Sequence, residues 1–231
     1  MSTEAKPEYS PGLAGVIAGE TKICWVDPNA GLMYRGYDIH EMGDKATFEE
    51  VAYLLLNGEL PNGKQLKEFK EQIAAQRELP KEVVEMLRLL PKSTHPMDML
   101  RTGVSMLSAF DKDLDDNSHD ANIRKSIKLI ARVMTLITDG WRILHGQDAL
   151  PEKPELNQAG NFFYKLDGKV PEAWQTRMMD TIFNLYADHE FNASTFAARV
   201  TASTLAGIYA AVTSAVGTLK GHCTAGPTKN R

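Results

Sequence analysis

Hydrophobic residues recur at three- and four-residue intervals over most of this 231-residue chain, and this spacing is the feature that most constrains its fold. Thr47 and Glu50 form a T-x-x-E pattern typical of a helix N-terminus, and Asn57-Gly58 ends the helix. The same spacing predicts helices over residues 65–76, 81–90, 96–110, 122–144, 172–188 and 192–219, the last being the longest. The sequence therefore predicts an all-α fold.

The segment before Thr47 has a different pattern. β-branched and aromatic residues at 23–26 and 32–34 flank the turn-forming residues 27–31, which predicts a short N-terminal β-hairpin. Residues 1–11 are expected to be an N-terminal tail, and they contain no apolar run of the signal-peptide type.

Composition and charge limit the classes of partner. The chain has 30 acidic and 26 basic side chains and no basic block, so we expect no nucleic-acid partner. Cys24 and Cys223, its two cysteines, are far apart and support neither a disulfide framework nor a zinc site, which favours the cytoplasm. Residues 205–216, the most apolar stretch, are too short to span a bilayer, so we expect no membrane partner.

Residues 111–120 contain five aspartates but lack the glycine and the closing glutamate of an EF-hand. We therefore interpret this segment as a solvated loop and expect no metal site. Residues 193–217 are rich in Ala, Ser, Thr and Gly, which lets neighbouring backbones approach closely. Such a helix lies in the core or in a tight helix–helix interface, and a symmetric dimer contact is the alternative.

His189 is the histidine with the most informative surroundings. Asp188 and Glu190 flank it, but successive helical side chains diverge too far to share one metal ion. Neighbouring carboxylates favour an imidazolium, which beside a helix N-terminus can donate to an anionic ligand. A structural histidine with a buried hydrogen bond is the alternative. Asn192 can cap the following helix or contact a ligand, and His95 is predicted to cap the helix that begins at Pro96.

The segment Ala187-Asp188-His189-Glu190-Phe191-Asn192-Ala193-Ser194-Thr195 closely resembles the citrate synthase family, including its 2-methylcitrate synthase branch. Further landmarks occur in family order, and the resemblance covers about residues 12–221. These landmarks are Gly12-Leu13-Ala14-Gly15-Val16, Tyr34-Arg35-Gly36-Tyr37-Asp38-Ile39, residues 48–61, and His95-Pro96-Met97-Asp98-Met99-Leu100-Arg101-Thr102-Gly103-Val104.

The resemblance implies a multihelical large domain with a smaller mobile one, a homodimer, and condensation of acetyl-CoA with oxaloacetate to citrate and CoA. It implies that His189 holds oxaloacetate and that Asn192 lines the same pocket. In this chemistry a carboxylate removes a proton from the acetyl methyl group while a histidine donates to the thioester carbonyl. Acyl-CoA is a cosubstrate, no cofactor is implied, and propionyl-CoA remains the alternative acyl donor.

The sequence departs from the family after Gly221. The family continues Pro-Leu-His-Gly-Gly-Ala-Asn-Glu, whose histidine is the acid for the thioester carbonyl, whereas residues 222–229 read His-Cys-Thr-Ala-Gly-Pro-Thr-Lys. One added C before their codons allows the family sequence to be read. We therefore hypothesise that residues 222–231 are an out-of-frame tail and that His222 is not the catalytic histidine.

On this reading, residues 12–221 are the N-terminal portion of a citrate synthase-like domain. The rest of the fold, with most of the small domain, is expected to be missing. No catalytic residue is intact, so the chain alone is expected to be inactive. Helices left without their packing partners are expected to expose apolar faces. A non-catalytic helical dimerisation fragment and a small-anion binding fragment remain alternatives.

Overall fold

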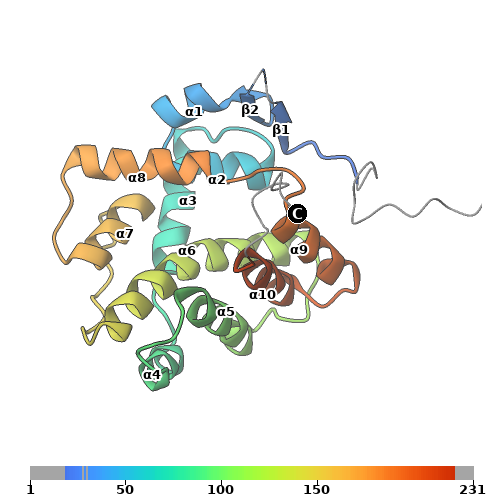
Figure 1. Ribbon diagram of the computed structural model, residues 1–231. Helices are drawn as coiled ribbons and strands as arrows, with labels where there is room; N and C mark the ends of the chain where they lie inside the picture. The colour runs from blue at the N-terminus through green and yellow to red at the C-terminus, as the bar shows by residue number, and fades with distance from the viewer. Residues whose placement is uncertain (1–18, 28, 30, 222–231) are drawn as a thin grey trace, which may run out of the picture.

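A computed structural model describes residues 19–27, 29 and 31–221 (Figure 1). This part of the chain holds ten α-helices and one three-stranded antiparallel sheet. The predicted all-α fold with an N-terminal hairpin is confirmed. The predicted tails, residues 1–11 and 222–231, lie outside the described residues. No helix of the described part is both long enough and apolar enough to cross a membrane.

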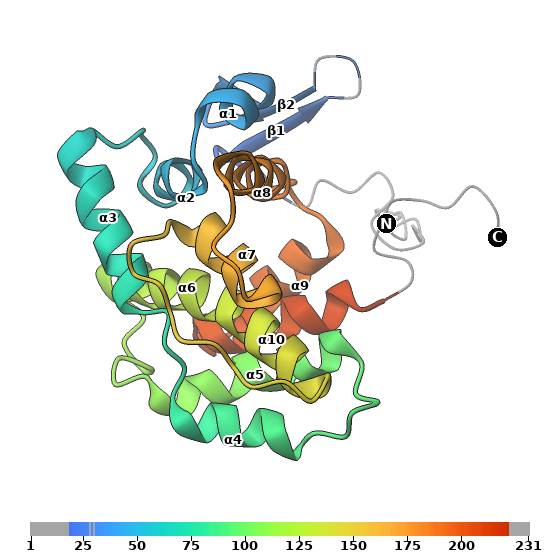
Figure 2. The ribbon, with the colours of Figure 1, turned by 90° about the vertical axis from the view of Figure 1, so that its left-hand side faces the viewer.

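The sheet comprises β1 (Cys24–Asp27), β2 (Gly31–Tyr34) and β3 (Tyr37–Asp38). Cys24 pairs with Tyr34 across β1 and β2, and both side chains are buried. They pack with side chains of α1 (Ile39–Lys45) and α2 (Phe48–Asn57) in one apolar cluster. The hairpin and α1 lie at one end of the molecule, next to α8 (Ala173–Leu185), as Figure 2 shows. The sequence did not predict α1.

The predicted helix starts are confirmed where capping residues mark them. The Thr47 backbone N–H donates to Glu50 Oε2 over 2.7 Å, and Gly58, in a left-handed conformation at φ +93°, ends α2. His95 accepts a hydrogen bond from the Met97 N–H at the start of α5 (Pro96–Leu107). Between these helices lie α3 (Gly63–Ala75) and α4 (Lys81–Leu89).

The main apolar cluster joins α4, α5, α6 (His119–Leu144) and the last helix of the described chain. Two glycines let α5 and α6 approach closely. A Cβ on Gly103 would lie 2.7 Å from Leu136 Cδ2, and one on Gly140 would overlap Met99 Sδ. The α5–α6 crossing therefore depends on the absence of a side chain at both positions.

Helix α7 (Gln158–Asp167) was not predicted, and it begins where the polar stretch of residues 146–158 ends. Its buried face carries polar side chains, which conceal the helical period. Gln158, Asn161 and Lys165 are each no more than 3% exposed. Asn157 caps the helix by accepting from the Gly160 N–H.

The prediction of one longest helix over residues 192–219 is wrong. The segment forms α9 (Ala193–Ser203) and α10 (Ile208–Leu219), and α6, with 26 residues, is the longest helix described. The chain breaks because Leu205 and Gly207 have positive φ angles of 62° and 82°. Helix α10 packs between α9 and α5, as expected for small residues, whereas α9 has no buried residue.

Candidate functional site

His189 lies in the loop between α8 and α9, and its side chain is exposed. Three residues later, Asn192 is the N-cap of α9, and its Oδ1 accepts from the Thr195 N–H over 2.9 Å. The capping role expected of Asn192 is confirmed, and a ligand contact by the same side chain stays a prediction. The loop thus places the exposed residue His189 three positions before the N-cap of an 11-residue helix, whose N-terminus carries a partial positive charge that favours anions.

The two carboxylates beside His189 have backbone partners. Asp188 Oδ1 accepts from the Glu190 N–H over 2.9 Å, and Glu190 Oε1 accepts from the Val26 N–H of β1 over 2.8 Å. Glu190 also adopts a left-handed backbone, with φ +56°. The carboxylates therefore fix the loop through hydrogen bonds, a role that the sequence analysis did not assign to them.

The contacts between the N-terminal hairpin and the His189 loop are the part of the site that the sequence did not predict. The Tyr34 hydroxyl, on a fully buried side chain, donates to the Asn184 carbonyl at the end of α8 over 2.8 Å. Burial raises the pKa of Tyr34 to about 12, so this hydroxyl stays protonated at neutral pH. Its partner lies 150 positions further along the chain, and no local pattern reports such a contact.

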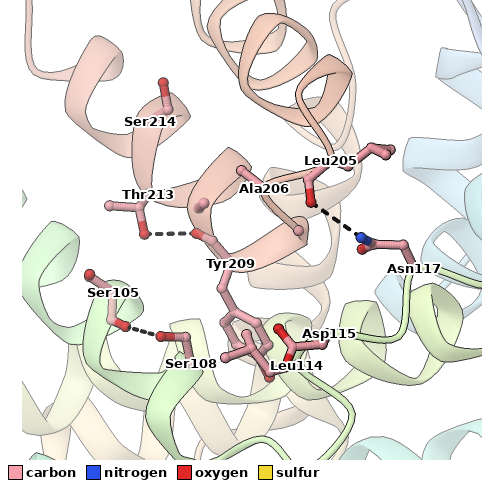
Figure 3. A pocket seen from close by; sticks show the side chains of 12 residues that line it. Ser105, Ser108, Leu114, Asp115, Asn117, Leu205, Ala206, Tyr209, Thr213 and Ser214 are labelled. Carbon is pink, nitrogen blue, oxygen red and sulfur yellow. Dashed lines mark hydrogen bonds between the residues drawn. The ribbon is translucent and has the colours of Figure 1, made fainter.

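A second feature is a hollow of about 570 Å³ between α5, the loop after it and α10 (Figure 3). Its lining includes no residue of the His189 loop and no histidine, cysteine or basic side chain, and its polar groups are the Asp115 carboxylate, the Asn117 amide and the hydroxyls of serine, threonine and tyrosine. Twelve residues line it: Ser105, Ser108, Leu114, Asp115, Asn117, Leu205, Ala206, Gly207, Tyr209, Ala210, Thr213 and Ser214.

Residues 112–118 are exposed or half-buried, as expected of a solvated loop, but Asp111 at its start is buried. Its side chain is buried, pairs with Lys128 over 2.8 Å and accepts a hydrogen bond from the Tyr209 hydroxyl of α10. Burial opposes ionisation, but the hydrogen bonds from Lys128 and Tyr209 outweigh it and hold the pKa of Asp111 below its usual range. The first aspartate therefore ties the loop to α6 and α10, and the described residues contain no cluster of three or more metal-ligating side chains.

The remaining described histidines do not join this loop. His95 is a helix cap, and the His145 ring lies 3.9 Å from the Trp141 ring at the end of α6. His40 and His119 lie in the first turns of α1 and α6. His222 lies outside the described residues.

Known proteins of one family match this chain over most of its length. The family model "Citrate synthase, C-terminal domain" matches residues 12–229. A citrate synthase of Heyndrickxia coagulans is 38% identical over 216 residues, covering 93% of this chain and 58% of that protein. A citrate/2-methylcitrate synthase of Bacillus subtilis is 39% identical over 220 residues, covering 95% of this chain and 59% of that protein.

Solved structures of citrate synthases have the same fold as this chain. Citrate synthase from Pyrobaculum aerophilum superposes with a TM-score of 0.89 at 34% identity, covering 97% of this chain and 60% of that one. Citrate synthase from Thermoplasma acidophilum, in a ternary complex with carboxymethyl coenzyme A and oxaloacetate, gives a TM-score of 0.83 at 30% identity, covering 90% and 55%. This chain thus spans less than two thirds of the relatives that it matches, and it belongs to the citrate synthase family.

Proposed function

We propose that this chain carries the oxaloacetate-binding portion of a citrate synthase-type active site, with His189 donating a hydrogen bond to oxaloacetate. The observation that supports this role is the exposed His189 imidazole at the N-terminal end of α9. Oxaloacetate is a dianion, and both an imidazole N–H and a helix N-terminus favour negative charge. Asn192, next to the same helix end, is proposed to line the pocket.

The proposed reaction condenses an acyl-CoA with oxaloacetate. A carboxylate removes a proton from the acetyl methyl group, the resulting enol attacks the keto carbon, and the keto oxygen takes up a proton. Water then hydrolyses the citryl thioester to citrate and CoA. Residues 222–226 read His-Cys-Thr-Ala-Gly where the family has Pro-Leu-His-Gly-Gly, so no residue here corresponds to its thioester-polarising histidine. We therefore propose that this chain alone binds oxaloacetate without completing the condensation, and that it needs no cofactor.

The acyl donor is tested by restoring the reading frame after Gly221 and measuring CoA release with acetyl-CoA and with propionyl-CoA. We expect oxaloacetate-dependent release with acetyl-CoA to be the faster of the two, and faster release with propionyl-CoA would assign 2-methylcitrate synthesis instead. The unrestored 231-residue chain is the matched control and is expected to release no CoA. His189→Ala in the restored protein is expected to raise the oxaloacetate KM, because it removes the proposed donor.

We also propose a cytoplasmic homodimer in which α9 and α10 contribute to the subunit contact. The support is that α9 has no buried residue although its side chains are small and mostly apolar. A non-catalytic dimerisation fragment would share this contact. Light scattering after gel filtration tests it: a dimer mass supports the proposal, and a monomer at all concentrations contradicts it.

A further inference from the structure

We infer that the N-terminal hairpin positions His189, with Tyr34 and Glu190 as the positioning residues, an inference that rests on the proposed oxaloacetate site. The hairpin and the loop between α8 and α9 are far apart in sequence but joined by hydrogen bonds at two points. The loop residues on either side of His189 are held, whereas the His189 side chain is exposed.

The first point of attachment is Tyr34. Its hydroxyl donates to the Asn184 carbonyl over 2.8 Å and accepts from the Asp188 N–H over 3.4 Å. One buried hydroxyl therefore joins the end of α8 to the residue that precedes His189. Since the tyrosine side chain is fully buried, its hydroxyl has no water with which to replace these partners.

The second point of attachment is Glu190. The strand order places β1 at the edge of the sheet, and Glu190 Oε1 accepts from the Val26 N–H of this edge strand. A glutamate with positive φ is uncommon, and surrounding contacts must maintain it. Both its backbone N–H and its carboxylate are fixed, by Asp188 and by Val26.

Neighbouring contacts extend this attachment. Burial and the adjacent Asp188 carboxylate raise the pKa of Cys24 to about 12, so a neutral thiol faces that carboxylate. On the other side of His189, the Arg199 guanidinium lies 4.8 Å from the centroid of the Phe191 ring. A Cβ on Gly19 would lie 3.3 Å from the same ring, so the backbone before the hairpin also packs against the loop.

These contacts fix the backbone on both sides of the one exposed side chain that the proposed site uses. A donor held in one position by its supporting residues loses less conformational entropy when a ligand binds. The hairpin therefore increases oxaloacetate affinity through His189 without touching the ligand.

The test measures the 231-residue chain and its variants by two methods: amide hydrogen exchange at residues 188–192, and calorimetric titration with oxaloacetate. Glu190→Ala and Tyr34→Phe are each expected to accelerate exchange and weaken oxaloacetate binding about tenfold, the scale of one lost hydrogen bond. Glu190→Gln is expected to restore binding, because its amide oxygen can accept from the Val26 N–H.

The matched control is Glu50→Ala, which removes a comparable carboxylate–backbone hydrogen bond of 2.7 Å at the start of α2. It is expected to lower stability and leave oxaloacetate affinity unchanged. Faster exchange in Glu190→Ala with unchanged affinity would overturn the positioning role and leave the proposed function standing. A Glu190→Gln variant as weak as Glu190→Ala, or unchanged exchange in both test variants, would also overturn it. If the unaltered chain binds no oxaloacetate, the proposed function fails and the positioning role with it.

Discussion

Asp139 gives a quantitative test of how a buried charge cluster affects stability. Asp139 and Lys165 are 4% and 2% exposed, and their Oδ1 and Nζ atoms lie 3.0 Å apart. Lys165 also pairs with Glu152. Two carboxylates thus share one ammonium group between α6, α7 and the intervening loop. Attraction to the ammonium group favours the ionised carboxylates, whereas their loss of hydration on burial opposes ionisation.

Burial dominates for Asp139. It raises the pKa of this carboxyl from 3.8 to about 6, although Lys165 acts in the opposite direction. Since one pKa unit corresponds to about 1.4 kcal/mol, ionising Asp139 costs the folded chain about 3 kcal/mol more than the unfolded chain. The pKa of Asp139 is higher in the folded chain than in the unfolded chain. Protonated Asp139 therefore stabilises the folded chain fully below about pH 4, and this stabilisation is lost as the pH rises through about 6.

Replacing Asp139 with Asn removes the charge and keeps an oxygen that can accept from Lys165. At pH 7.5 we expect Asp139→Asn to raise the free energy of unfolding by up to about 3 kcal/mol, and at pH 4 to leave it nearly unchanged. Urea unfolding followed by circular dichroism, at intervals from pH 4 to 8, measures both values.

Lys165→Met is the opposite control. It leaves two buried carboxylates without their ammonium partner, so it is expected to cost about 3–5 kcal/mol at pH 7.5. A lower stability of Asp139→Asn than of the unaltered chain at pH 7.5 would refute the reasoning, because it would show that attraction to Lys165 exceeds the cost of burial. If Asp139→Asn and the unaltered chain showed the same pH dependence of the free energy of unfolding, the reasoning would be refuted as well.

Three further predictions concern packing, a buried hydrogen bond and the gene. Gly140→Ala is expected to lower the free energy of unfolding by about 1–2 kcal/mol, because its Cβ would displace Met99 and overpacking outweighs the gain in helix propensity; a rise in the urea midpoint would contradict this. Tyr209→Phe is expected to cost about 1.5–3 kcal/mol in the same assay by removing the hydrogen bond to the buried Asp111 carboxylate, and an unchanged midpoint would contradict it. Residues 222–231 are expected to result from one lost nucleotide after the Gly221 codon, either in a naturally disrupted gene or through a sequencing error; resequencing that finds the nucleotide would show the error, and downstream DNA that encodes the family's continuation in no frame would contradict the frameshift hypothesis.

Local signals in the sequence predicted the helix starts well. The Thr47–Glu50 pair and the His95–Pro96 sequence act within a few residues, so the sequence contains the whole interaction. The break between α9 and α10 was missed because Leu205 is not a residue that normally adopts positive φ. Helix α7 was missed because its buried positions hold polar residues such as Lys165, whose partners come from other elements.

The candidate site was predicted only in part, because some of its contacts are local in sequence and others are not. The Asp188-His189-Glu190 motif and the cap at Asn192 are local, and the sequence identified both. The hydrogen bonds of Tyr34 and Glu190 join residues at least 150 positions apart, so only the folded chain reveals them. Local sequence patterns therefore identify the proposed ligand-contacting residues but not the elements that hold them.

The most direct test of the central claim is a calorimetric titration of the 231-residue chain with oxaloacetate, in parallel with His189→Ala. We predict saturable binding by the unaltered chain and a loss of at least about tenfold in affinity on His189→Ala, the scale of one charge-assisted hydrogen bond. Equal affinity in the two proteins, or no binding by the unaltered chain, would contradict the claim that His189 holds oxaloacetate.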